Sequence, residues 1–157
     1  MKKIITTLII VAILIGGYAI YTINREIVLD TDIGVEENNK LLRHFKEVFE
    51  SEVPVKAGYA DINNDLIPDL VVVYRDNEQD KNFMCAVLDF KDEYFITGSI
   101  PAPYENVEIQ FKDIDEKDEM EFIVSGSKDG NYGYAIYRLS EEKQLRDLFS
   151  ENMEDCC

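Results

Sequence analysis

The chain has 157 residues and a formal net charge of −16, with 32 acidic against 16 basic side chains. This length allows one modest core and excludes a large multidomain enzyme. The acidity disfavours nucleic acid and anionic lipid surfaces as partners and attracts cations, although it would also keep an exported domain soluble without any ligand.

An apolar stretch opens the chain: Lys2 and Lys3 precede the uncharged residues 4–23. At about 1.5 Å per residue, a helix of this length spans a bilayer core of about 30 Å. The positive-inside rule keeps the two lysines in the cytoplasm. We therefore predict a transmembrane anchor over 1–24, a juxtamembrane linker over 25–35 and a single-pass cell-membrane protein with an extracytoplasmic domain. A cleaved signal peptide is the alternative, but its Ala-x-Ala site is not evident.

An amphipathic helix is expected next, over residues 36–51. Its apolar side chains recur at spacings that place them on one helical face. His44, the sole histidine, falls between the core positions and is expected to be exposed. This leaves no histidine for general-base catalysis or for a histidine-containing metal site. The expected core positions are Leu41, Leu42, Phe45, Val48 and Phe49.

From Val53 onward, clusters of Pro, Gly, Asn and Asp separate short runs rich in Val, Ile, Tyr and Phe, which indicates antiparallel strands. An acidic turn that leads into an apolar strand occurs twice, about fifty residues apart. Asp61 aligns with Asp113, and Asp69 aligns with Glu121. The predicted strands are 55–61, 69–75, 83–90, 93–99, 106–113, 120–126, 132–139 and 143–149, the last of which fits a helix as well.

The sequence thus predicts a mainly β soluble domain over 36–149. It consists of the amphipathic helix and two four-stranded antiparallel units of propeller-blade type, at about 53–100 and 104–149. Two units cannot close a propeller, which needs about four blades or more. The pair is therefore expected to stack on itself or on the helix.

The first acidic turn carries oxygen-bearing side chains at positions one, three, five and nine: Asp61, Asn63, Asp65 and Asp69. At this spacing oxygen ligands converge on a hard cation such as calcium. The turn and the strand after it resemble the FG-GAP or VCBS repeats of integrin-like β-propellers. The resemblance implies a calcium site at these four residues.

Two residues depart from the pattern of these repeats. Leu66 stands at the glycine of the tight turn, and Lys117 stands at the fifth position of the second turn, where its ammonium group would repel a cation. The alternative to a calcium site is that Asp61 and Asp113 accept hydrogen bonds from backbone N–H groups of their own turns, as Asx residues commonly do.

The three cysteines fall in two settings. Cys85 lies in an apolar run and is expected in the core, because free cysteine is among the most buried residue types. Cys156 and Cys157 follow polar residues without apolar periodicity, so a flexible tail with exposed thiols is predicted over 150–157. A disulfide between adjacent cysteines would be strained and labile. Both sulfurs can instead bind one soft metal ion, and the neighbouring carboxylates favour its arrival.

The layout of a short anchor, an acidic domain and a terminal Cys156–Cys157 pair resembles the Cys-Cys-COOH (seleno)protein SaoC family. In that family one of the two terminal positions can be selenocysteine, whereas both are cysteine here. The resemblance implies membership of a bacterial selenocysteine-assisted organometal cluster, with a transporter and an organomercurial-lyase-like protein as partners. Only Cys156 and Cys157 carry over as functional positions.

The leading hypothesis is a membrane-anchored extracytoplasmic protein that binds or relays a soft metal or organometal, such as mercury, through Cys156 and Cys157. A thiol–disulfide redox partner that presents the same pair is the second hypothesis. A calcium-ordered interaction module built on the Asp61 turn is the third. The sequence contains no evident nucleophile–base–acid constellation or phosphate-binding glycine loop, so no enzymatic activity is predicted.

Overall fold

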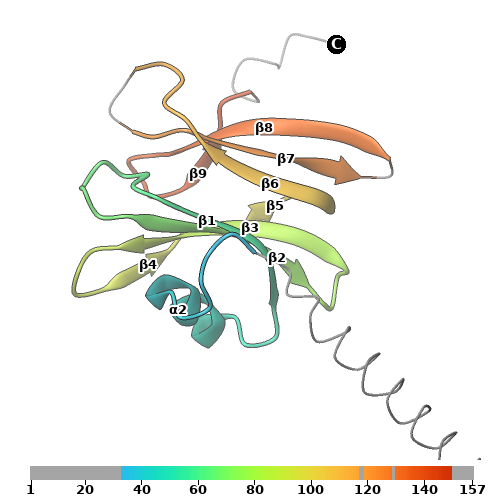
Figure 1. Ribbon diagram of the computed structural model, residues 1–157, viewed down its shortest axis with the longest axis horizontal. Helices are drawn as coiled ribbons and strands as arrows, with labels where there is room; N and C mark the ends of the chain where they lie inside the picture. Colours follow the sequence, from blue (N-terminus) through green and yellow to red (C-terminus); the bar gives the residue numbers. More distant parts are fainter. Residues whose placement is uncertain (1–32, 117–118, 129, 150–157) are drawn as a thin grey trace, which may run out of the picture. The chain divides into compact units, whose positions relative to one another are not determined.

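The computed structural model describes residues 33–116, 119–128 and 130–149. The predicted anchor over 1–24, most of the linker and the tail over 150–157 therefore lie outside the described residues. Within the described ranges, no helix is long and apolar enough to cross a membrane. These residues form a short helix and two antiparallel sheets, which confirms the prediction of a mainly β domain (Figure 1).

Helix α2 (Lys40–Val48) is shorter than the predicted 36–51. It begins where the Asn39 side chain accepts hydrogen bonds from the backbone N–H groups of Leu41 at 2.9 Å and Leu42 at 3.2 Å, an N-cap of the usual kind. The helix buries Leu41, Leu42 and Phe45, as predicted.

Two details of the predicted helix are wrong. Val48 is 56% exposed, because the helix ends at this residue and Phe49 leaves the helical conformation. His44 is half-buried, and its ring centroid lies 4.9 Å from that of Tyr94. The histidine packs on an aromatic ring of the neighbouring sheet, a contact that helical periodicity cannot reveal.

Sheet A corresponds to the first predicted unit and has five strands, joined in the order β1-β2-β3-β4 with β5 also paired to β3. Of the predicted strand 93–99 only residues 94–96 form a strand, and an additional short strand follows at residues 100–101. Between them, the Thr97 hydroxyl accepts the N–H of Ala86 at 3.0 Å, in place of a backbone carbonyl. The strands are β1 (Val53–Ala60), β2 (Asp69–Asp76), β3 (Lys81–Asp89), β4 (Tyr94–Ile96) and β5 (Ile100–Pro101).

Sheet B corresponds to the second predicted unit and has four antiparallel strands in sequence order, as predicted. The last of them is a strand and not a helix. Its strands are β6 (Glu105–Phe111), β7 (Phe122–Lys128), β8 (Asn131–Leu139) and β9 (Leu145–Asp147).

Sheet A lies between helix α2 and sheet B (Figure 1). Alternate residues of β2 explain this arrangement, because successive side chains of a strand point to opposite faces. Leu70 and Val72 join the core under α2, whereas Val71 and Val73 join the core between the sheets. The described residues show two stacked sheets and no closure into a propeller.

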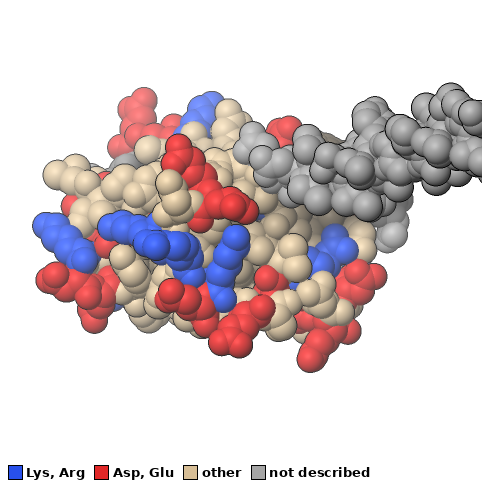
Figure 2. Space-filling model, turned by 60° about the horizontal axis from the view of Figure 1, so that its bottom comes forward, with Lys and Arg blue, Asp and Glu red and all other residues tan. Residues whose placement is uncertain are grey.

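The two sheets approach closely at Gly58 of β1. A Cβ atom at this position would lie 2.6 Å from Cε2 of Phe111 on β6, closer than real Cβ atoms come to their neighbours. Glycine is therefore required here by packing and not by backbone conformation. On the face of the molecule seen in Figure 2, acidic and basic side chains are interspersed.

Candidate functional site

The first acidic turn is held by its own side chains. Asp61 accepts hydrogen bonds from the backbone N–H groups of Asp65 at 3.2 Å and Leu66 at 2.8 Å. Asn63 accepts a second bond from the Asp65 N–H at 3.0 Å, and the Asp65 carboxylate accepts the N–H of Ile67 at 2.8 Å. The side chains predicted to bind calcium thus also organise the backbone, as the Asx alternative expects.

Leu66 adopts the backbone conformation that glycine supplies in the FG-GAP type of turn. Its φ angle is +68°, in the left-handed region, and its side chain is 88% exposed. A side chain in this region costs about 1 kcal/mol or more. Leu66 therefore lowers the stability of the turn relative to a glycine at this position.

Asp69 lies at the base of the same turn and is completely buried. Its carboxylate accepts the N–H of Ile62 at 3.2 Å and the N–H of Asp89 at 2.9 Å. Burial raises the pKa of Asp69 to about 6, against the lowering effect of these two hydrogen bonds. The nearby Asp65 and Asp61 raise this pKa further. Asp69 thus supports the turn from inside the core.

The carboxylates that come together belong to the second turn. Among the described residues, oxygen atoms of Asp113, Asp115 and Glu121 lie within 4.8 Å of one another, a group that could hold a metal ion. The carboxylates of the first turn do not meet this distance. Sequence reasoning set the second turn aside because of Lys117, which lies outside the described residues.

The guanidinium group of Arg138, on β8, lies among the carboxylates of the second turn. Its guanidinium donates to Asp115 at 2.6 Å and also to Glu121, which is completely buried. The hydrogen bonds to Asp115 and Glu121 raise the pKa of Arg138 above its usual value. The arginine supplies the positive charge that a bound cation would otherwise supply. No local spacing signal indicates it, because Arg138 follows Glu121 by a whole strand and a turn.

The two turns have the same internal support. Just as Asp69 accepts the N–H of Ile62, Glu121 accepts the N–H of Ile114 at 2.8 Å, seven residues earlier in each case. The strand registers pair Leu70 with Val87 and Phe122 with Tyr137, so the position of Arg138 is occupied in sheet A by the uncharged Leu88.

Sheet A also contains a buried carboxylate, Asp89, and its negative charge is balanced in a different way from that of Glu121. Asp89 is completely buried, and its carboxylate contacts the ammonium group of Lys40 at the start of α2. The buried carboxylate in the third strand of sheet A is therefore neutralised from the helix. In sheet B, Arg138 of β8 neutralises the turn itself.

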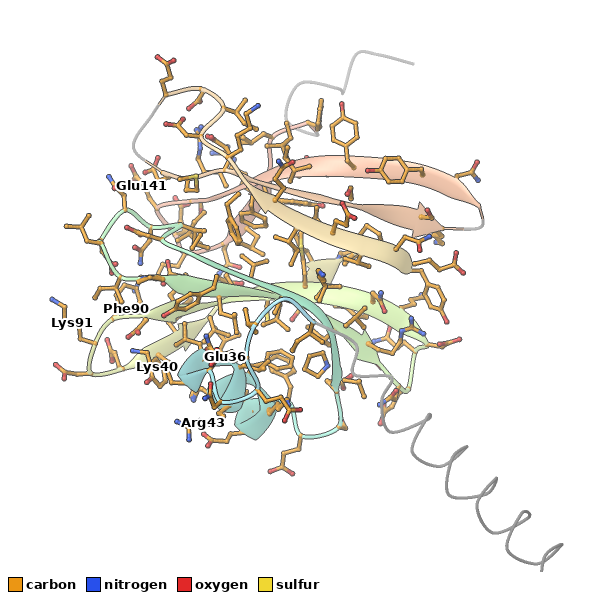
Figure 3. All side chains as sticks on the ribbon, in the orientation of Figure 1. Glu36, Lys40, Arg43, Phe90, Lys91 and Glu141 are labelled. Atoms are coloured by element: carbon orange, nitrogen blue, oxygen red, sulfur yellow. The ribbon has the colours of Figure 1, made fainter. Side chains whose placement is uncertain are left out.

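A cavity of about 230 Å³ lies beside both turns. Asn63, Asp65 and Glu119 contribute to its lining, together with Phe90 of the β3–β4 connection and Glu141 of the β8–β9 connection (Figure 3). Lys143, which also lines the cavity, places its ammonium group 4.2 Å from the centroid of the Phe90 ring. The cavity thus contains a positively charged group of the protein itself, the ammonium group of Lys143.

The thiol of Cys85, the one cysteine among the described residues, is not accessible to solvent. Cys85 of β3 is completely buried between strands and helix, as predicted, and burial raises its pKa to about 12. A thiol with this pKa is almost entirely protonated at neutral pH, so it is a poor metal ligand and nucleophile. Cys156 and Cys157 lie outside the described residues.

Comparison with known proteins gives no further assignment for these residues. No family model, no curated protein and no solved structure matches this chain.

Proposed function

We propose that this chain is a membrane-anchored extracytoplasmic binding protein whose Cys156–Cys157 pair captures or relays a soft metal ion or an organometal cation such as mercury. The anchor is the apolar segment 4–23, and the two sheets serve as a pair of propeller-blade-like units that carry the thiols. The resemblance to the SaoC family motivates the organometal as ligand and a transporter or organometal-processing protein as partner.

The observation that carries the proposal is the burial of Cys85. Because this thiol is sealed in the core and its pKa is raised to about 12, soft-metal chemistry is left to Cys156 and Cys157. Two adjacent sulfurs hold a thiophilic ion that carboxylates hold poorly. The acidic chain, with its formal net charge of −16, favours the approach of a cation.

The geometry of the acidic turns also favours soft over hard cations. In the second turn, the guanidinium of Arg138 already neutralises Asp115 and Glu121. In the first turn, Asp61 and Asp65 hold backbone N–H groups. A calcium ion at either turn would have to compete with these internal partners.

The proposal is tested by titrating the full chain with Hg(II). The double variant Cys156→Ser/Cys157→Ser should lose tight binding, whereas the matched control Cys85→Ala should retain it, because Cys85 is buried. Equal affinity and stoichiometry in the double variant and the parent would overturn the proposal. If the parent instead forms a reversible disulfide at Cys156–Cys157 and binds no metal, the thiol–disulfide redox function is correct.

A calcium-ordered interaction module is the second candidate. It is favoured by Leu66, whose left-handed backbone reproduces the glycine conformation of calcium-binding repeats. Its ligands would be Asp61, Asn63, Asp65 and Asp69. Calcium should then raise the thermal midpoint of the parent but not of Asp61→Ala, and an equal response in both would exclude it.

A further inference from the structure

One face of sheet B is left open by the described residues. Phe122, Val124 and Tyr137 point to the core between the sheets, so the alternate residues of β7 and β8 point away from it. On this side Tyr132 is 69% exposed and Tyr134 is 59% exposed. We call this surface the outer face of sheet B, formed by Ile123, Ser125, Ser127, Tyr132, Tyr134 and Ile136.

The face of sheet A that points away from sheet B is covered. Helix α2 packs Leu41, Leu42 and Phe45 on it, where they contact the apolar side chains of β2 and β3 (Figure 1). Large aromatic side chains on an exposed sheet are typical of a binding surface.

The charge of this surface is mixed. Strands β7 and β8 contain no Asp or Glu, but Glu108 of β6 is exposed and is paired with Ser125, so it points to the outer face. Arg146 of β9 is paired across the sheet with Arg138, so it points to the same side. The surface thus suits an apolar side chain packed on its exposed tyrosines.

The chain's own residues 150–157 match this description. The last described residue, Phe149, already lies on the surface, because its ring meets Tyr134 edge-on at a centroid distance of 5.6 Å. The segment that follows has three acidic residues and one large apolar side chain, Met153. Its eight residues can extend about 26 Å at about 3.3 Å per residue, well beyond the spacing from Tyr134 to Tyr132.

We propose that residues 150–157 dock on the outer face of sheet B, with Met153 packed against Tyr132 and Tyr134. Sulfur–aromatic contact stabilises such packing. The docked segment covers the outer face as α2 covers sheet A, and it holds Cys156–Cys157 close to the sheet. The proposal does not depend on whether these thiols bind a metal.

The test is the rate at which Cys156 and Cys157 react with a disulfide reagent in the full chain without metal. Cys85 is buried, so it does not contribute to the fast reaction. If the segment is docked about 80% of the time and only the undocked form reacts, undocking accelerates the reaction about fivefold. Tyr132→Ser/Tyr134→Ser should show this acceleration.

Two further variants complete the test. Met153→Ser leaves the described domain untouched and should accelerate the reaction as the tyrosine variants do. The matched control is Tyr59→Ser, at a tyrosine of β1 that is 44% exposed, and it should react at the parent rate. Rates that are equal in all four proteins would overturn the proposal. Protection that increases with protein concentration would also overturn it, because the occupant would then be a second copy of the chain.

Discussion

Replacement of Arg138 by glutamine tests whether this arginine takes the place of a cation in the second acidic turn. The change removes the guanidinium from Asp115 and from Glu121, which is completely buried. Glu121 then keeps the Ile114 N–H at 2.8 Å but loses its ion pair with Arg138. Loss of one partner of a buried ion pair costs about 3–5 kcal/mol.

The lower end of that range is expected for Arg138→Gln. The Asp115 side chain is 33% exposed, so water stabilises part of the uncompensated charge. A loss of about 3 kcal/mol, with an m-value of about 1.5 kcal/mol/M, lowers the urea midpoint by about 2 M. Urea unfolding at neutral pH, followed by far-UV circular dichroism, measures this shift.

The effect of calcium on the stability of Arg138→Gln is the second and more specific measurement. Without the guanidinium, Asp113, Asp115 and Glu121 form an open oxygen site for a divalent cation. Calcium at ten to a hundred times its dissociation constant would restore about 1.4–2.7 kcal/mol to the variant. Parent and variant should therefore differ in their response to calcium, whatever calcium does at the first turn.

Arg146→Gln is the matched control, because Arg146 is an exposed arginine directly across the sheet from Arg138. A surface change of this kind should alter stability by about 0.5 kcal/mol or less. The reasoning is refuted if Arg138→Gln costs no more than Arg146→Gln. It is also refuted if calcium stabilises the parent and the Arg138 variant equally.

Three further changes follow from the structure. Gly58→Ala should lower the free energy of unfolding by about 1–3 kcal/mol in urea, since its Cβ would meet Phe111 at 2.6 Å. Leu66→Gly should raise it by about 1 kcal/mol, because glycine relieves the strain at φ +68°. Asp69, with its pKa raised to about 6, should make the parent lose about 2 kcal/mol relative to Asp69→Asn as the pH rises from 4 to 7.

The sign of the Asp69 effect follows from linkage. Its folded-state pKa lies above the unfolded value of 3.8, so between these values the folded chain binds more protons than the unfolded chain. Stability from this group is thus greatest below pH 3.8 and is lost as the pH rises through about 6. Parallel profiles of stability against pH for the parent and Asp69→Asn would contradict this prediction. The other two predictions would be contradicted if Gly58→Ala left stability unchanged or if Leu66→Gly lowered it.

The elements that could be predicted from sequence are those set by local pattern. The apolar run within 69–75 and the turn residues before it predict β2, and helical spacing predicts the burial of Leu41, Leu42 and Phe45. The aligned positions Asp69 and Glu121 play the same supporting role in both turns. These features depend on neighbours within about ten residues.

The features that could not be predicted depend on contacts between distant segments. Arg138 reaches Glu121 only because β8 pairs beside β7, and Lys40 reaches Asp89 only because α2 lies on sheet A. The predicted strand 93–99 ends early, at Ile96, next to the bond that the Thr97 hydroxyl accepts from Ala86. Because Lys117 is expected to repel a cation, sequence reasoning gives little weight to the second turn, although its carboxylates are the ones that lie close together.

The central claim, that Cys156 and Cys157 together bind one soft metal ion, is tested most directly by X-ray absorption at the mercury edge. The full chain is loaded with one equivalent of Hg(II). The account predicts that each Hg(II) is bound by both sulfurs of a single chain and that this sulfur signal disappears in Cys156→Ser/Cys157→Ser. Mercury bound by a single sulfur, or a spectrum unchanged in the double variant, would contradict it.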